Sequence, residues 1–295
     1  GTAVLAQRQA AGRVRASESQ SGVPVQLPRA ENHLTLLACV AGEDPAFVLL
    51  YLNADQNCIH LLGVPGQLAV PFSDGEASLA DCYAAAGPAR CLQGLGAVVD
   101  LPEDARYLAA TPETLAGLCD AYGNLRVGFS GVLSPEERTR FDQTGVRDWD
   151  GVSAHAFLQA LADSLAPDTA AAARAAVWDA FFRQNLEALP AALPDSLREA
   201  SGSLLTDLTA ADLLTLEDTL ELLANNGAVV ESSVLPGRTD RRSGLYVLGE
   251  EAGPAVQAFF NVADSAPASG TQSASSSAPY PSTSVPGGQP AGPSM

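Results

Sequence analysis

Three apolar runs follow one another closely near the start of the chain: LTLLACV (34–40), FVLLYL (47–52) and CIHLLGV (58–64). Each run has the length of a β-strand, and the turn-forming stretches GEDP (42–45) and NADQN (53–57) separate them. None of the three alternates regularly between polar and apolar residues, which indicates strands that are covered on both faces. We therefore expect these runs to form the middle of a sheet.

The rest of the chain alternates between strand-like and helix-like segments. Thr111, Pro112 and Glu113 have the pattern of a helix start, with a capping hydroxyl, a proline in the first turn and an early carboxylate. The expected strands lie over 105–110, 125–129 and 229–235, and the expected helices over 77–86, 89–95, 111–122, 152–165, 167–189, 193–224 and 255–262. This alternation predicts an α/β fold, a three-layer α-β-α sandwich around a mixed central sheet.

Length and charge limit the classes of function. The chain has 295 residues, 46% of them apolar, and a net charge of −18, and its 16 basic residues are all arginine. Binding to nucleic acid or to an anionic membrane surface needs a basic face, so we expect no nucleic-acid partner. We expect a lead-in over residues 1–31, a single domain over 32–262, and a disordered Ser/Pro/Gly-rich tail over 263–295.

The cysteines and histidines show no metal-binding pattern. The five cysteines contain no CxxC pair, and the three histidines lack zinc-ligand spacing. Cys39 and Cys58 lie inside strand runs and are expected to be small buried apolar residues. No apolar run is long enough to span a bilayer. The chain starts at Gly1 rather than at a methionine, which leaves room for a removed membrane anchor.

The order of motifs along the chain resembles that of a known protein family. Asp44 lies at the mouth of the second strand, Pro65 follows the third, YAAAGP (83–88) comes next, and Gly123 ends the segment that starts at 105. In this order the chain resembles the extracytoplasmic domain of the LytR-CpsA-Psr family over roughly residues 32–190, and more weakly near its end. Members of that family are envelope proteins that transfer anionic glycopolymers from a polyprenyl-pyrophosphate carrier to peptidoglycan. The resemblance implies an α-β-α sandwich with an apolar tunnel for the prenyl chain, and an extracytoplasmic, membrane-anchored location.

The family's working residues are only partly present. Its Arg-x-Asp-Thr motif corresponds here to Gly42 and Asp44. Its Ser-Ile-Pro-Arg-Asp motif, whose Arg and Asp serve the pyrophosphate and its magnesium, corresponds to GVPGQ (63–67), and a family lysine falls on Ser78. The Arg and Asp of this family motif are therefore replaced here by Gly66 and Gln67.

The later helical motif of the family is also reduced. After FLQ (157–159), only Asp168 and Arg174 match it, and Ala171 stands at its other arginine position. The resemblance makes Arg174 the candidate catalytic and ligand-binding residue, and Asp44 and Asp168 the candidate magnesium ligands. Holding a pyrophosphate requires several positive charges, so this pattern argues against family-type transfer.

A separate basic cluster, Arg238, Arg241 and Arg242, lies in an expected polar loop over 237–243. It is either a solvated loop or an anion contact, and we keep all three arginines as candidate ligand-binding residues.

Three functions remain open. The first is a non-catalytic binding or regulatory module at the cell envelope that contacts polyprenyl phosphate or cell-wall glycan. The second is an active magnesium-dependent phosphotransferase with relocated residues, and the third is a surface protein-interaction module. A hydrolase is disfavoured, because the chain has no Gly-x-Ser-x-Gly motif and His33, His60 and His155 have no evident nucleophile partner.

Overall fold

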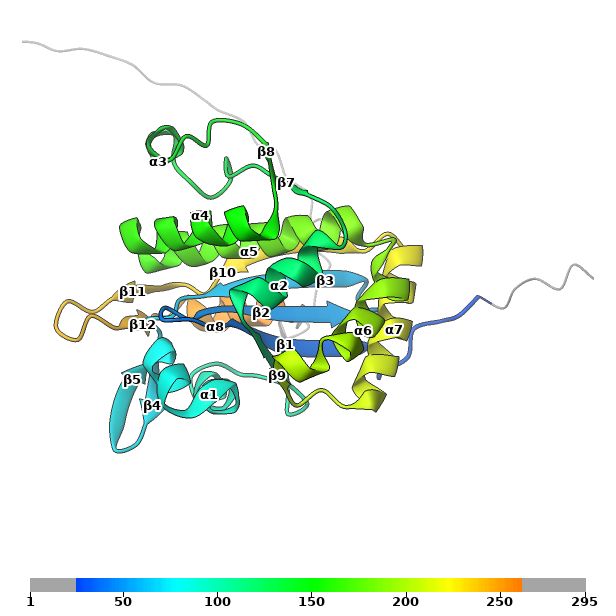
Figure 1. Ribbon diagram of the computed structural model, residues 1–295. Coiled ribbons are helices and arrows are strands. Elements are labelled where there is room, and N and C mark those ends of the chain that lie inside the picture. The colour runs from blue at the N-terminus through cyan, green and yellow to red at the C-terminus, as the bar shows by residue number, and fades with distance from the viewer. Residues whose placement is uncertain (1–24, 262–295) are drawn as a thin grey trace, which may run out of the picture. The chain divides into compact units, whose positions relative to one another are not determined.

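The computed structural model describes residues 25–261, and a six-stranded sheet forms its centre (Figure 1). The strand order is β10-β3-β2-β1-β6-β9. These strands are β1 (His33–Val40), β2 (Ala46–Asn53), β3 (Cys58–Val64), β6 (Arg106–Ala110), β9 (Leu204–Thr206) and β10 (Val229–Val234). The three apolar runs are thus the middle of the sheet, as the sequence predicts.

The sheet is mixed, also as predicted. β1 runs antiparallel to β2, with His33 opposite Asn53 and Val40 opposite Ala46, and β2 runs antiparallel to β3. β6 pairs with β1 and β10 pairs with β3 in the parallel sense, whereas β9 is antiparallel to β6. The parallel pairs need crossover connections, and helices supply them.

Successive strand side chains enter two separate cores. Leu36, Leu50 and Ile59 point into one, and Leu37 and Leu49 point into the other. Both faces of the central strands are therefore buried, which explains why their sequences are continuously apolar.

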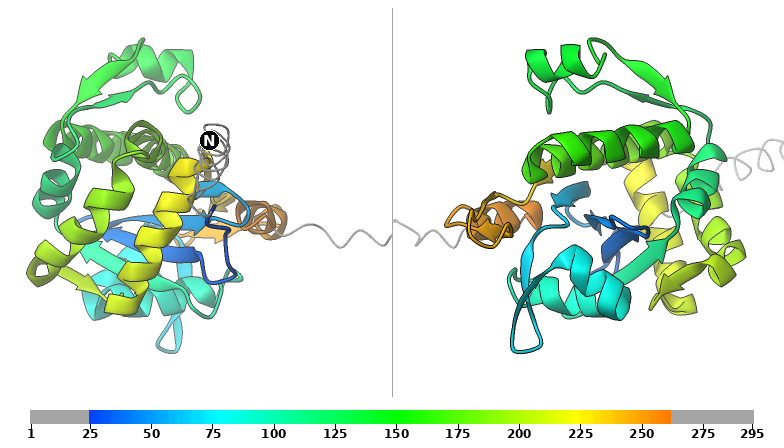
Figure 2. Two further views of the ribbon diagram at one scale, coloured as in Figure 1. Left: turned by 90° about the vertical axis from the view of Figure 1, so that its right-hand side faces the viewer. Right: turned by 60° about the vertical axis from the view of Figure 1, so that its left-hand side comes forward.

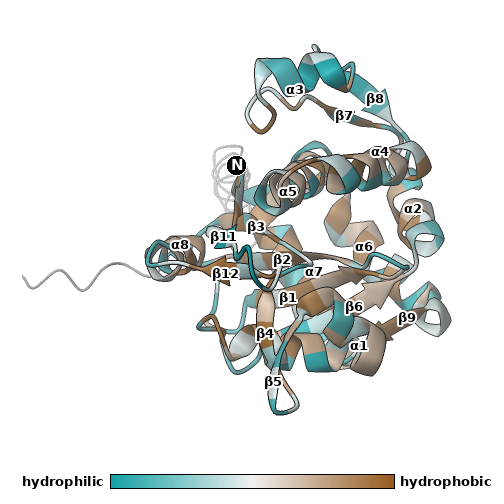
Figure 3. Ribbon diagram, turned by 90° about the vertical axis from the view of Figure 1, so that its left-hand side faces the viewer, coloured by the Kyte–Doolittle hydropathy of each residue, from teal (hydrophilic) through white to brown (hydrophobic). Residues whose placement is uncertain are grey.

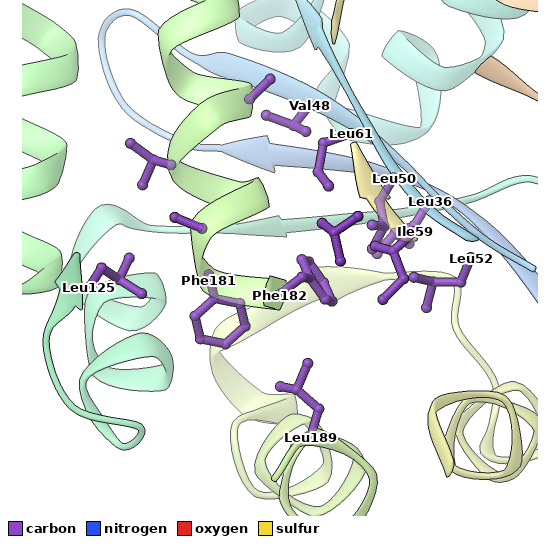
Figure 4. Close-up of a cluster of buried hydrophobic side chains, with 14 of the residues drawn as sticks. Leu36, Val48, Leu50, Leu52, Ile59, Leu61, Leu125, Phe181, Phe182 and Leu189 are labelled. Carbon is purple, nitrogen blue, oxygen red and sulfur yellow. The ribbon is translucent and has the colours of Figure 1, made fainter. Parts of the chain in front are cut away.

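Helices and hairpins cover both faces of the sheet (Figure 2). The first core lies under helices, and Figure 4 shows Phe181 and Phe182 gathered there with strand side chains. These helices are α2 (Pro112–Asp120), α4 (Gly151–Ser164), α5 (Pro167–Asn185), α6 (Leu189–Glu199) and α7 (Ala210–Asn225). The second core lies under α1 (Leu79–Gly96), α8 (Ala252–Phe259) and the hairpins β4 (Ala69–Phe72)–β5 (Gly75–Ser78) and β11 (Gly237–Thr239)–β12 (Tyr246–Leu248). This is the predicted three-layer sandwich.

Local sequence signals mark the start of α2 and the break in α1. The Thr111 hydroxyl accepts a hydrogen bond from the Thr114 amide at 3.2 Å, as the sequence predicts for the start of α2. The two helices expected over 77–86 and 89–95 form the single element α1, which is broken at Gly87 with φ 80° and ψ −175°. Only glycine adopts such a conformation without strain, so the sequence correctly places the break there.

Several short elements differ from the sequence-based expectation. The strand expected over 125–129 is the shorter β7 (Leu125–Val127), which pairs with β8 (Arg147–Trp149) outside the central sheet. Between them lies α3 (Pro135–Arg140), whose residues are mostly hydrophilic (Figure 3). β9 interrupts the helical region expected over 193–224, and the loop expected over 237–243 forms part of the β11–β12 hairpin. Strands of three residues are too short to show a periodic pattern.

The predicted lead-in and tail fall largely outside the described part of the chain. Residues 25–29 form neither helix nor strand, and residues 1–24 and 262–295 lie outside it. The domain boundaries therefore remain predictions. Within residues 25–261, every helix is too short or too polar to cross a membrane.

Candidate anion and lipid site

A polar cavity of about 260 Å³ lies where the segments before β2 and after β3 meet the start of α1 and the helices α4 and α5. Its lining brings together most of the positions that the resemblance aligns with family motifs. These residues are Asp44, Pro65, Gly66, Gln67, Ser78, Gln159, Ala171 and Arg174. Residues far apart in the sequence thus share one cavity.

An apolar cavity of about 130 Å³ lies between the sheet and the helices α2, α4, α5, α6 and α7. Leucine, valine and phenylalanine side chains make up most of its wall, and His155, Arg174 and Cys119 are the residues with titratable groups that line it. An apolar cavity of about 150 Å³ is large enough to hold a benzene molecule. The space suits part of an apolar chain.

Arg174 lines both cavities. It is 6% exposed, and within residues 25–261 its guanidinium has neither a hydrogen bond nor an ion pair. Burial lowers the pKa of Arg174 to about 10, so the side chain is still positively charged at pH 7. A buried charge without a partner is unfavourable, and an anionic ligand would relieve that cost.

A close contact between α5 and β3 places Arg174. Gly63 of β3 lies directly under Ala171 of α5, and a Cβ atom at Gly63 would overlap the Ala171 carbonyl. Because α5 can approach β3 so closely, Arg174, one turn after Ala171, is held against the end of the sheet.

The carboxylates of the polar cavity differ from those that the resemblance implies. Asp44 lines it, but Asp168 does not, and Asp163 of α4 does. The Asp168 carboxylate accepts a hydrogen bond from the Thr169 amide at 2.9 Å. The family motifs do not indicate Asp163, although it lies four residues after Gln159 and therefore on the same side of the helix.

Asp44 and Asp163 are both exposed at the cavity. Magnesium is commonly held by one or two carboxylates together with water and substrate phosphate oxygens, and this pair fits that donor set. Within residues 25–261 no group of three or more Asp, Glu, His or Cys side chains is placed to hold a metal ion. The two carboxylates would therefore need a ligand's phosphate to complete a magnesium site.

The replaced motif positions contribute no charge to the cavity. Gly66 has no side chain, and a Cβ atom there would lie 3.1 Å from the Pro45 carbonyl oxygen. Ser78 caps α1, with its hydroxyl accepting a hydrogen bond from the Asp81 amide at 3.0 Å. Among the residues that line the cavity, Arg174 supplies its one guanidinium.

The basic cluster lies on the β11–β12 hairpin, with Arg238 in β11 and Arg241 and Arg242 in the turn. All three are exposed, and none lines the polar or the apolar cavity. The hairpin is nevertheless joined to the polar cavity, because the Tyr246 amide donates to the Gln67 carbonyl at 2.8 Å.

The histidines and cysteines have distinct environments. Burial and then the charge of Arg174 lower the pKa of His155. His60 is buried, and its Nδ1 lies 2.6 Å from the Phe259 carbonyl oxygen.

Burial raises the pKa of Cys39 and Cys119 to about 12 and that of Cys58 to about 11, so these thiols stay protonated at neutral pH. The prediction that Cys39 and Cys58 are buried is confirmed.

Comparisons with known proteins agree with this fold. No family model matches the sequence, and no curated protein matches it. B. subtilis TagT superimposes with a TM-score of 0.58 at 16% identity, covering 81% of this chain and 95% of that chain. TagT bound to LIIa-WTA has also been solved, and it superimposes equally well.

Two further structures are similar. A putative transcription regulator from Eubacterium siraeum has a TM-score of 0.61 at 17% identity, covering 84% of this chain and 98% of that chain. A transcriptional regulator from Enterococcus faecalis has a TM-score of 0.59 at 17% identity, covering 78% of this chain and 88% of that chain. At such identities the likeness concerns the fold alone. The chain has the fold of the LytR-CpsA-Psr proteins, at low sequence identity to them.

Proposed function

We propose that the protein is a non-catalytic binding or regulatory module of the cell envelope, and that its ligand has a phosphate head group and an apolar chain, as a polyprenyl phosphate has. One observation carries this proposal. The guanidinium of Arg174, which is buried and has no hydrogen-bond or ion-pair partner among residues 25–261, lies on the boundary between an apolar cavity and a polar one. A phosphate at Arg174 would have its chain on the apolar side and any attached glycan on the polar side.

The fold supports the same proposal. TagT, which has this fold, has been solved bound to LIIa-WTA and to LI-WTA. We also propose an extracytoplasmic location and a membrane anchor in the full-length protein, as the resemblance to the LytR-CpsA-Psr family implies.

The experiment is native mass spectrometry of the protein with farnesyl phosphate and farnesyl pyrophosphate, each with magnesium and with EDTA. We expect retained lipid without turnover. Arg174→Met should weaken retention about 10- to 100-fold, because it removes a charged hydrogen-bonding partner. Arg147→Gln is the matched control, since Arg147 is exposed and pairs with Asp142 at 2.8 Å. Equal retention by Arg174→Met and the wild type would contradict the proposal.

An active magnesium-dependent phosphotransferase is the second candidate, and the pair Asp44 and Asp163 at the polar cavity favours it. In that case the two carboxylates would hold the magnesium with the ligand's phosphates, and Arg174 would stabilise charge on the transferred phosphate. Magnesium-dependent cleavage of the pyrophosphate that is lost in Asp44→Asn and Asp163→Asn would establish this candidate. Absence of retained lipid under every condition would instead favour the surface protein-interaction module.

We also propose that Arg238, Arg241 and Arg242 contact the part of the ligand beyond its head group, because their hairpin is joined to the polar cavity at Gln67. The double substitution of Arg241 and Arg242 by Gln is expected to weaken binding of a glycosylated lipid phosphate several-fold and to leave farnesyl phosphate binding unchanged. Titrations of both ligands, followed by tryptophan fluorescence, test this. An equal loss for both ligands would assign the cluster to the head group, and no loss for either would leave it a solvated loop.

A further inference from the structure

The side chains that line the two cavities supply too little positive charge to balance an anionic ligand. The guanidinium of Arg174 lines both cavities, and Asp44 and Asp163 are the acidic residues on the same walls. A phosphate monoester carries roughly 1.5 to 2 negative charges at neutral pH. A single guanidinium does not balance that charge, so a second positive group would strengthen binding considerably.

His155 is the other side chain on these walls that can become positive. It lies on α4, three residues before Leu158 and four before Gln159, and residues at this spacing share one side of a helix. Leu158 lines both cavities and Gln159 lines the polar one, so His155 stands beside the boundary that Arg174 occupies. An anion at Arg174 would have the imidazole on its apolar side.

The charged groups that act on His155 come from the two helices packed against α4. Arg174 of α5 disfavours the protonated imidazole, and Glu113 of α2 favours it. Burial is the largest influence, and the net result is a pKa below the ordinary value. The neutral imidazole of His155 is therefore favoured in the ligand-free protein.

On the basis of the proposed function, we propose that His155 is a second contact for the phosphate head group and takes up a proton when the head group binds beside Arg174. The proton comes from solvent and forms the second N–H bond of the imidazole, and no bond between heavy atoms changes. The ligand's negative charge offsets the repulsion from Arg174 and favours the imidazolium. By linkage, affinity rises as the pH falls from the pKa of the bound form toward that of the free form, by roughly tenfold for each unit between the two.

Histidine NMR tests this directly, because the chain has only three histidines. The imidazole carbon-bound proton shifts of His33, His60 and His155 are titrated between pH 5 and 9 in EDTA, with and without farnesyl phosphate. We expect the pKa of His155 to rise by about one unit or more with the lipid, while the other two histidines stay unchanged. Bound lipid with an unchanged His155 titration would overturn the inference and leave the proposed function standing.

Calorimetry gives a second readout. Proton uptake on binding farnesyl phosphate at pH 7 is measured in buffers of different ionisation enthalpy for the wild type, His155→Gln and the control His33→Gln. We expect the wild type and His33→Gln to take up a similar fraction of a proton and His155→Gln to take up less, with the ligand's own titration common to all three. Equal uptake by all three proteins would refute a role for His155. No binding by the folded wild type at any pH would overturn the proposed function and this inference together.

Discussion

The guanidinium of Arg174 is unfavourable for folding when no anion is bound. Its pKa is lowered to about 10 by burial, and among the described residues no carboxylate compensates its charge. Even a buried ion pair can often be replaced by apolar side chains of similar volume without loss of stability, and a buried charge without a partner lacks the attraction that offsets its desolvation. Residues that serve a ligand commonly reduce stability in this way.

We therefore predict that Arg174→Met raises the free energy of unfolding by about 1–3 kcal/mol while it weakens lipid binding. Urea unfolding of the ligand-free protein measures the first effect and native mass spectrometry the second. Arg147→Met, at an exposed ion pair, should change stability by less than about 1 kcal/mol. A loss of stability in Arg174→Met would mean that this arginine supports the fold.

The surroundings of His33 predict that the free energy of unfolding depends on pH. Partial burial acts to lower its pKa, but a 2.6 Å contact with Asp104, a hydrogen bond to the Ala30 carbonyl and the charge of Asp104 outweigh it, so the pKa is raised. The resulting stabilisation is complete below the ordinary histidine pKa of about 6.5 and is lost as the pH rises through the folded-state value.

Asp104→Asn should accordingly lower stability at pH 5.5 more than at pH 9. Because both side chains are partly exposed, the difference should be under about 1 kcal/mol. Urea unfolding at the two pH values measures it. Equal losses at both would show that the contact acts only as a neutral hydrogen bond.

At the scale of elements, the crossing of α5 over β3 positions the site. Gly63→Ala would force the Ala171 backbone to move, and we predict a loss of about 1–3 kcal/mol together with weaker lipid binding, because Arg174 lies one turn further along α5. Gly117→Ala is the matched control. Gly117 lies inside α2 with open space around it, so alanine should be neutral or stabilising by up to about 1 kcal/mol. Unchanged binding in a destabilised Gly63→Ala variant would separate the helix crossing from the site.

At the scale of the whole molecule, the domain limits remain to be tested. The two cores lie within residues 25–261, so we predict that a fragment of these residues melts within a few degrees of the full chain. Differential scanning calorimetry of the two proteins makes the comparison. A large fall in melting temperature would show that residues outside this range contribute to the folded core.

Much of the fold could be predicted from local sequence. Continuous apolar runs indicate strands buried on both faces, and capping residues such as Thr111 mark where helices begin. The short pieces could not be predicted in the same way. β7, β8 and β9 each have three residues, and their pairing depends on distant partners rather than on a periodic pattern.

The candidate site was predictable only in part. Asp44 and Arg174, which the motif resemblance indicates, do share a cavity, whereas Asp168, which it also indicates, lies outside the lining of that cavity. Asp163 and His155 had no motif to identify them, and their place at the cavities follows from how α4 packs beside α5.

Local sequence is enough to predict the three central strands, the break in the helix at Gly87 and the loss of the charged motif between 63 and 67. Which charges meet depends on how the helices pack: Arg174 lies buried between two cavities, without a partner in the described part of the chain, and His155 lies beside it. The physical reason is that burial and capping leave a local, periodic trace in a sequence. Proximity between side chains of different elements depends on how those elements pack, and for α5 over β3 the contact of Gly63 with Ala171 allows the close approach.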